Sequence, residues 1–221
     1  MTNLYSEKNF EEHIEDRLLD SDYIKRTTED YDQELCLVPD EVIAFIKDTQ
    51  PNEYKKLERQ YGSDTDDKLC YRLSQEIYKY GTLHVLRKGI KDRGAKLKLA
   101  FFKPSSGMNP EHLKLYNKNR ISLIRQLHYS SRAEKSLDMG IFLNGIPVAT
   151  AELKNSLTGQ FVEEAIKQYK NDRDPKEPLF KFKRCLVHFA VGNEKVFMTT
   201  KLEGPKTTFL PFNKGIINPV N

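Results

Sequence analysis

Hydrophobic residues in the first part of the chain recur at helical spacing. Phe10, Ile14 and Leu18 lie four residues apart, so they share one side of a helix predicted over residues 6–20. Prolines suit the first turns and glycines the ends of further helices, which are predicted over residues 39–48, 51–61 and 66–80. We therefore expect a mostly helical insertion or flank over about residues 31–95.

The pattern changes to strand-like alternation from about residue 96 onward. Residues 119–129 carry one alternating register, which predicts a strand with Ile121, Leu123, Arg125, Leu127 and Tyr129 on one side. Asn144 and Gly145 predict a hairpin turn between two apolar runs. The other predicted elements are a strand over residues 96–102, a helix over 160–171, and a hairpin joining 185–191 to 195–200. This order predicts an α/β (α+β) domain with a mixed β-sheet core flanked by helices, in which the last helix crosses over between parallel strands.

Composition then limits the class of protein. With 221 residues, of which 38% are hydrophobic, the chain is long and apolar enough for one folded domain. No apolar run approaches the roughly 20 residues of a membrane helix, and the polar, acidic start is unlike a secretory signal. Cys36, Cys70 and Cys185 are odd in number and far apart, which favours free thiols in a reducing, cytoplasmic setting. The net charge of +4 is too small to indicate a partner.

The residue types with the clearest chemistry are Asp138, Glu152 and Lys154. Side chains two apart on a strand leave the same face, so Glu152 and Lys154 point together. Mg²⁺ prefers carboxylate oxygens and keeps several waters, so Asp138 and Glu152 are the predicted metal ligands of a phosphodiesterase site. Lys154 would orient the attacking water or stabilise developing negative charge.

The same spacing of acid and lysine occurs three more times, starting at Glu53, Asp66 and Asp174. Those triplets lie in polar segments where solvent explains the charges, whereas Glu152 and Lys154 interrupt an apolar strand. Charges at buried strand positions are costly unless they are paired or hold a metal. The alternative to a metal site is therefore a salt-bridged cluster formed by the three charged residues themselves.

The hairpin register decides whether the two acids can share a site. A two-residue Asn144-Gly145 loop with regular pairing places Asp138 opposite Ala151, and Glu152 then leaves the other face of the sheet. A three-residue loop, or a bulge, shifts the register by one and places Asp138 opposite Glu152. We expect such a shift.

Polar residues near these strands are candidates for contacts with DNA phosphates. Gln160, Glu164 and Gln168 share a face of the predicted helix, and Lys167 and Arg125 add positive charge, although solvated or salt-bridged positions are the alternative. His128 and His188 lie in apolar strands and are expected to be core histidines. The chain has no G-x-x-x-x-G-K-[ST] motif, so this chain alone is not expected to bind ATP.

Four segments together resemble a known family: RQLHYS, SLDMGIFLNGIPVATAELKN, LTGQFVEEAIKQYKNDRDP and LVHFAV…TFLPFNKG. They resemble the N-terminal nuclease domain of the R (restriction) subunit of type I restriction–modification enzymes, over about residues 4–215. The resemblance implies a restriction-endonuclease-like fold of the PD-(D/E)xK superfamily, with Asp138, Glu152 and Lys154 as its motif residues and a catalytic core over about 96–215.

The resemblance also implies two further site residues. The acid of the first helix falls on Glu11, with Glu7 and Glu12 as rivals. The glutamine of the family's Q-x-x-x-Y motif falls on Gln168, although Tyr169 follows at once and Asp172 stands four residues on.

The implied activity is Mg²⁺-dependent, non-specific cleavage of double-stranded DNA after ATP-driven translocation by a motor that this chain lacks. The chain would then be a fragment of a longer subunit, whose partners are the translocase domains and the methyltransferase (M) and specificity (S) subunits. Two alternatives stay open: a docking module whose acidic cluster is structural, and a stand-alone DNA-repair nuclease of the same superfamily.

Overall fold

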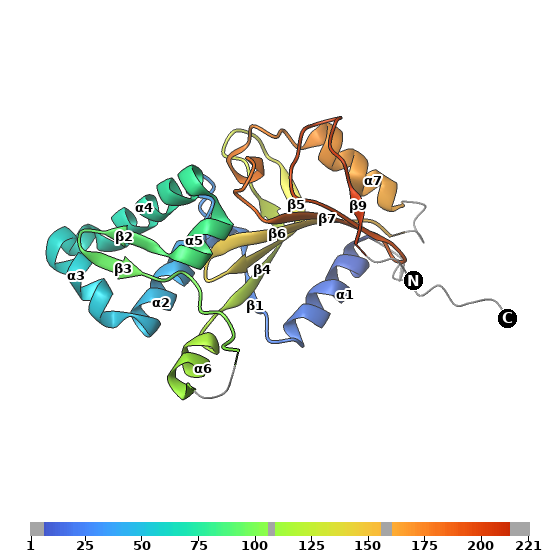
Figure 1. Cartoon of the computed structure of the whole chain (residues 1–221). Helices are drawn as coiled ribbons and strands as arrows, with labels where there is room; N and C mark the ends of the chain where they lie inside the picture. The colour runs from blue at the N-terminus through green and yellow to red at the C-terminus, as the bar shows by residue number, and fades with distance from the viewer. Residues whose placement is uncertain (1–6, 106–108, 156–160, 213–221) are drawn as a thin grey trace.

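The computed structural model describes residues 7–105, 109–155 and 161–212. In these residues a seven-stranded mixed sheet runs in the order β1-β4-β5-β6-β7-β8-β9, and β2 and β3 form a small second sheet (Figure 1). The strands are β1 (Ile24–Arg26), β2 (Ile90–Asp92), β3 (Ala95–Leu97), β4 (Ile121–His128), β5 (Ser136–Leu143), β6 (Ile146–Leu153), β7 (Val187–Val191), β8 (Val196–Thr199) and β9 (Leu210–Pro211). The predicted α/β class with a mixed sheet is confirmed.

Two parallel pairs, β1–β4 and β6–β7, make the sheet mixed, and its other neighbours are antiparallel. The chain passes from β6 to β7 through α7 (Val162–Lys167) and the π-helical turn η4 (Gln168–Asp172), which confirms the predicted crossover. The first residue of that predicted helix, Gln160, lies outside the described residues.

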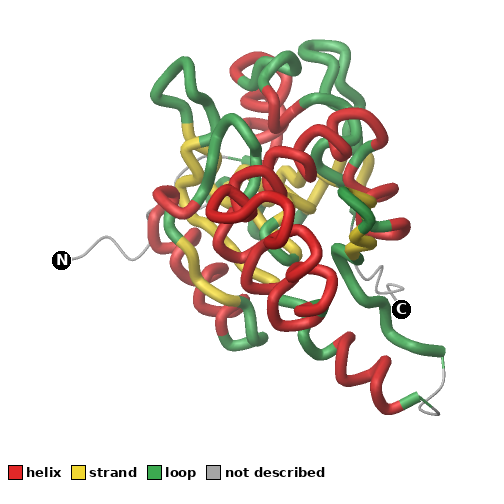
Figure 2. The backbone as a smooth tube through the Cα atoms, turned by 90° about the vertical axis from the view of Figure 1, so that its left-hand side faces the viewer, coloured by secondary structure: helices red, strands yellow, loops and turns green. Residues whose placement is uncertain are grey.

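Helices fill the range in which a helical insertion or flank was predicted. They are α2 (Pro39–Thr49), α3 (Pro51–Tyr61), α4 (Thr65–Tyr80) and α5 (Thr82–Lys88), with α6 (Pro110–Tyr116) further along the chain. Apolar side chains of α2, α3, α4 and α5 pack with the β2–β3 hairpin into one core that includes Phe45, Leu57, Leu73 and Leu97. Figure 2 shows these helices as a layer that faces the viewer. The prolines and glycines therefore marked the helix ends correctly.

The strand predicted over residues 96–102 is wrong beyond Leu97. The side chain of Gln50 accepts a hydrogen bond from the Lys98 amide at 2.7 Å and donates one to the Lys98 carbonyl at 2.9 Å. The Gln50 side chain therefore forms the hydrogen bonds that the Lys98 backbone would otherwise form with a neighbouring strand. The alternation of apolar and polar residues in the sequence does not indicate which of the two partners is present.

Helix α1 (Glu7–Leu19) covers one face of the sheet, and α7 with η4 covers the other (Figure 1). On the α1 side, Leu123, Met139, Ala151 and Leu153 pack with the predicted stripe of that helix. On the opposite side, Ile124, Leu127 and Tyr129 pack with Tyr169 of η4. None of the helices in the described residues is long and apolar enough to cross a membrane.

The single register predicted for β4 is wrong after Arg125. Leu123 packs on the α1 side, whereas Leu127 joins Ile124 on the opposite side. Gln126 has a φ of 51°, and this left-handed residue reverses the alternation of the strand.

The hairpin between β5 and β6 carries the expected shift, and its source is a bulge. The turn keeps two residues, since Leu143 pairs with Ile146. Both turn residues have positive φ, 53° for Asn144 and 80° for Gly145. The register then shifts between Ile141 and Phe142, after which Ile141 pairs with Ala149 and Met139 pairs with Ala151. The shifted register places Asp138 opposite Glu152, as predicted.

Candidate active site

Asp138 lies where β5 and β6 stop pairing through their main chains. The ladder between these strands reaches Met139 and Ala151. One residue further, the Asp138 carboxylate accepts a hydrogen bond from the Leu153 amide at 2.7 Å. The carboxylate therefore lies between the two strands, beside the position of Glu152.

Glu152 is fully buried on the face of β6 covered by η4. Its Oε1 accepts hydrogen bonds from Arg173, at 2.7 Å from Nε and 2.6 Å from Nη2. Its Oε2 is also buried, and within the described residues no hydrogen bond reaches this oxygen. An ionised carboxylate with one unsatisfied buried oxygen is costly without another positive group.

The charges around Glu152 show the same deficit. Burial and, to a smaller extent, the neighbouring Asp138 charge raise the pKa of Glu152 against the opposing effects of Arg173 and Lys154, and the net result is a pKa of about 8. Burial lowers the pKa of Arg173, but the charge and hydrogen bond of Glu152 outweigh this effect and raise it. Arg173 and Lys154 therefore do not fully offset the cost of burying Glu152 beside Asp138, and a divalent cation would add positive charge there.

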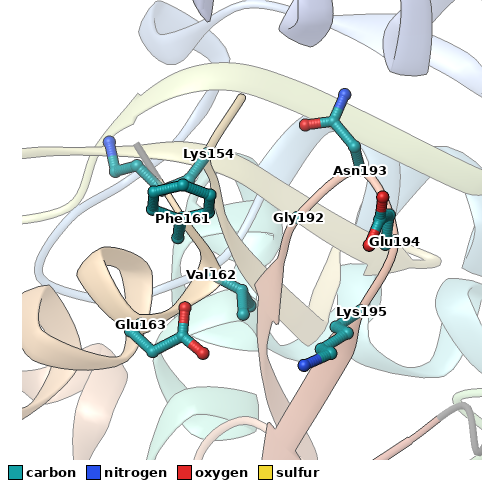
Figure 3. Close-up of a pocket in the computed structure, with 8 residues that line it drawn as sticks. All are labelled: Lys154, Phe161, Val162, Glu163, Gly192, Asn193, Glu194 and Lys195. Atoms are coloured by element: carbon teal, nitrogen blue, oxygen red, sulfur yellow. The ribbon is translucent and has the colours of Figure 1, made fainter. Parts of the chain in front are cut away.

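Lys154 follows on the same face, two residues after Glu152. Its side chain is largely buried, and its amide donates to the Val191 carbonyl of β7 at 2.8 Å. Lys154 lines a cavity of about 330 Å³, together with Phe161 and Val162 at the start of α7 and the loop from Gly192 to Lys195. Figure 3 shows Lys154 and Phe161 on one side of this cavity and the loop on the other.

The first helix brings two of the three rival acids to β4. Glu11 is buried and accepts a hydrogen bond from the Gln126 side chain at 3.0 Å. Glu12 pairs with Arg125 at 3.2 Å. Glu11 is thus bound to the part of β4 that stands opposite Asp138, and its role as the acid of the site stays a prediction. The Glu7 side chain lies outside the described residues.

The predicted DNA contacts occupy different surroundings. Arg125 lies on the α1 side, where Glu12 and Glu15 surround it, so the salt-bridged alternative describes its position. Lys167 is exposed and pairs with Glu164 at 2.6 Å. Gln168 begins the π-helical turn, and no hydrogen bond from the described residues reaches its buried Oε1. Contacts of these residues with DNA stay predictions.

The histidines and cysteines singled out in the sequence lie outside the candidate site. His188 is buried, its Nδ1 lies 2.7 Å from the Thr150 hydroxyl, and burial lowers its pKa to about 4, which confirms a core histidine. His128 is exposed, so its expected core position is wrong, because the reversal at Gln126 turns it outward. The three cysteines are buried free thiols, as expected.

The donor set of the site fits a hydrated magnesium ion. Among the described residues no group of three or more His, Cys, Asp or Glu side chains could enclose a metal. Asp138 and Glu152 nevertheless supply hard oxygen donors, and the buried Oε2 of Glu152 accepts no hydrogen bond from the described residues. Mg²⁺ is typically held by one or two protein carboxylates and retains several waters.

Arg173 is the residue that the sequence did not indicate. It lies in a charged stretch, NDRDP, where solvent exposure is the ordinary expectation. Only the packing of η4 on the sheet carries its guanidinium to Glu152, with the ring of Tyr129 5.7 Å away.

One comparison with known proteins matches nearly the whole described chain. A family model described as "Type I restriction enzyme R protein N terminus" matches residues 5–207. A search of the curated proteins finds no match.

Proposed function

The chain belongs to the family of type I restriction enzyme R protein N termini, and from this premise we propose that it is a Mg²⁺-dependent endonuclease domain of the PD-(D/E)xK type. Its substrate would be the phosphodiester backbone of double-stranded DNA. The observation that carries the proposal is the pair of adjacent carboxylates, Asp138 and Glu152, one of which is buried with an unsatisfied oxygen beside Lys154.

Each residue of the site has a separate task in this proposal. Asp138 and Glu152 would hold the ion, and Arg173 fixes the orientation of the Glu152 carboxylate by binding its other oxygen. A bound ion would supply positive charge at the scissile phosphate and would acidify a water. Lys154 would orient that water or neutralise the charge that develops on the phosphate oxygens. Its largely buried position strengthens this electrostatic effect.

The family supplies the wider setting of the proposal. The R protein would act in the cytoplasm, in a complex with methyltransferase and specificity subunits. Translocase domains of the same full-length subunit would consume ATP, and cleavage would follow translocation without sequence preference. Gln168 and Lys167 would contact backbone phosphates near the cut, because α7 and η4 cover the face on which Glu152 lies.

Two substitutions in the assembled enzyme test this function. Asp138→Asn and Lys154→Ala should each abolish DNA cleavage and leave ATP-driven translocation intact. Lys68→Ala is the matched control, since Asp66 and Lys68 have the same spacing in helix α4, where the exposed Lys68 pairs with Asp64. Plasmid cleavage and triplex displacement measure the two activities. Wild-type cleavage by Lys154→Ala would contradict the role of the lysine.

The ion pair between Glu152 and Arg173 favours one other function, a docking module with a structural charged cluster. Metal binding separates the two. The 221-residue chain should bind Mn²⁺, and Asp138→Asn should lose this binding; a structural cluster would bind no Mn²⁺ in either protein.

A further inference from the structure

Gln126 lies near the C-terminal end of β4, directly opposite the residue proposed to bind the metal. The register pairs Arg125 with Met139 and Leu127 with Leu137, so Gln126 stands across from Asp138. The side chain of Gln126 is exposed, which leaves it accessible at this end of the sheet.

The backbone of Gln126 is left-handed, with a φ of 51°. Non-glycine residues rarely adopt this conformation within a strand, and the exceptions are mostly Asn, Asp and His. Strained residues of this kind persist where the surrounding structure holds them, and they cluster at functional sites.

Two hydrogen bonds fix both ends of the Gln126 amide. Its Nε2 donates to the buried Glu11 carboxylate of α1 at 3.0 Å, and its Oε1 accepts from the Ser136 hydroxyl of β5 at 3.1 Å. The amide therefore joins the first helix to the strand that carries Asp138.

We propose that Gln126 is a positioning residue of the candidate site, which holds the Glu11 carboxylate at the end of β5 where Asp138 lies. The inference rests on the proposed nuclease function and adds a residue to it. Glu11 would then be a third acid of the site, and Gln126 acts only through Glu11. This arrangement gives the first helix its link to the site.

A purely structural explanation of Gln126 makes a different prediction. The reversal of β4 moves Leu127 to the same cluster as Ile124, and packing alone could require the left-handed residue. Glycine would meet that need better than glutamine, because it adopts positive φ without strain. Packing gives no reason for an amide that binds Glu11 and Ser136.

Mn²⁺ binding to the 221-residue chain, measured by electron paramagnetic resonance, tests the proposal without any cleavage assay. Gln126→Gly should melt at the same temperature as the parent or higher, yet bind Mn²⁺ about tenfold more weakly, as is typical when an outer partner of a metal ligand is removed. Gln126→Asn, which tolerates the backbone but is too short for both bonds, should weaken binding in the same direction. Arg93→Gly is the matched control, because Arg93 has a φ of 47° in the β2–β3 turn.

A double-mutant cycle shows whether Gln126 acts through Glu11. Glu11→Gln should weaken binding by a similar factor, and Gln126→Gly should add little to it, because the two residues form one unit. The positioning role would be overturned if Asp138→Asn abolished binding but Gln126→Gly and Gln126→Asn bound Mn²⁺ like the parent. Fully additive losses in the double mutant would overturn it as well. Binding that survives Asp138→Asn, or no binding by the parent, would overturn the proposed function and this inference with it.

Discussion

The buried Glu152 carboxyl makes the stability of the protein depend on pH in a direction that can be worked out. Its pKa rises from an ordinary 4.5 to about 8 in the folded state. Between these values the folded protein holds the proton and the unfolded chain releases it. Stabilisation from this group is therefore complete below about pH 4.5 and is lost as the pH rises through about 8.

Glu152→Gln removes this dependence, because the amide resembles the protonated acid at every pH. At about 1.4 kcal/mol per pKa unit, the rise from 4.5 to about 8 corresponds to roughly 5 kcal/mol at most. In metal-free buffer, the free energy of unfolding of the variant relative to the parent should therefore increase by roughly 4 kcal/mol between about pH 5 and about pH 9.

Urea unfolding of both proteins at several pH values measures this difference directly. Mg²⁺ added at about pH 9 should stabilise the parent and not the variant, whereas NaCl of equal ionic strength should affect both alike. A free-energy difference that stays constant across this range would refute the reasoning, since Glu152 would then titrate as it does in the unfolded chain.

Three further substitutions test the surroundings of the site by urea unfolding. Arg173→Gln leaves the buried Glu152 without its guanidinium and should lower the free energy of unfolding by about 3–5 kcal/mol at about pH 9, where Glu152 is ionised in the parent; a loss below about 1 kcal/mol would show that the pair is dispensable. Tyr169→Phe removes a buried hydroxyl bond of 2.8 Å to β6 and should cost about 1 kcal/mol; no loss would mean that the bond contributes nothing. Gly145→Ala should cost about 2 kcal/mol more than Gly94→Ala, because both residues have positive φ but only at Gly145 would an added Cβ lie 2.5 Å from a backbone oxygen; equal losses would contradict this steric argument.

The sequence predicted the helices well because their signals are local. The stripe of Phe10, Ile14 and Leu18, and the glycines after α3 and α4, depend on residues within one or two turns. The β4 strand shows the limit of this reasoning, since the reversal at Gln126 depends on what packs against both faces of the sheet.

The sequence likewise predicted some features of the candidate site and not others. The alternation of side chains along a strand predicted that Glu152 and Lys154 share a face of an apolar strand. It also predicted that a register shift is needed to place Asp138 opposite Glu152. The sequence did not show whether the loop or a bulge makes that shift, because both satisfy the same alternation.

By itself, the sequence determined which residue types could bind a cation and on which strands they lie, because both properties are fixed by composition and by a period of two residues. The tertiary structure alone decided their neighbours: Arg173 against Glu152, and Gln126 between Glu11 and Ser136. The contact of Arg173 with Glu152 joins residues 21 apart in the chain, and that of Gln126 with Glu11 joins residues 115 apart. Only the packing of α1 and η4 on opposite faces of the sheet brings them together, and no local pattern carries that information.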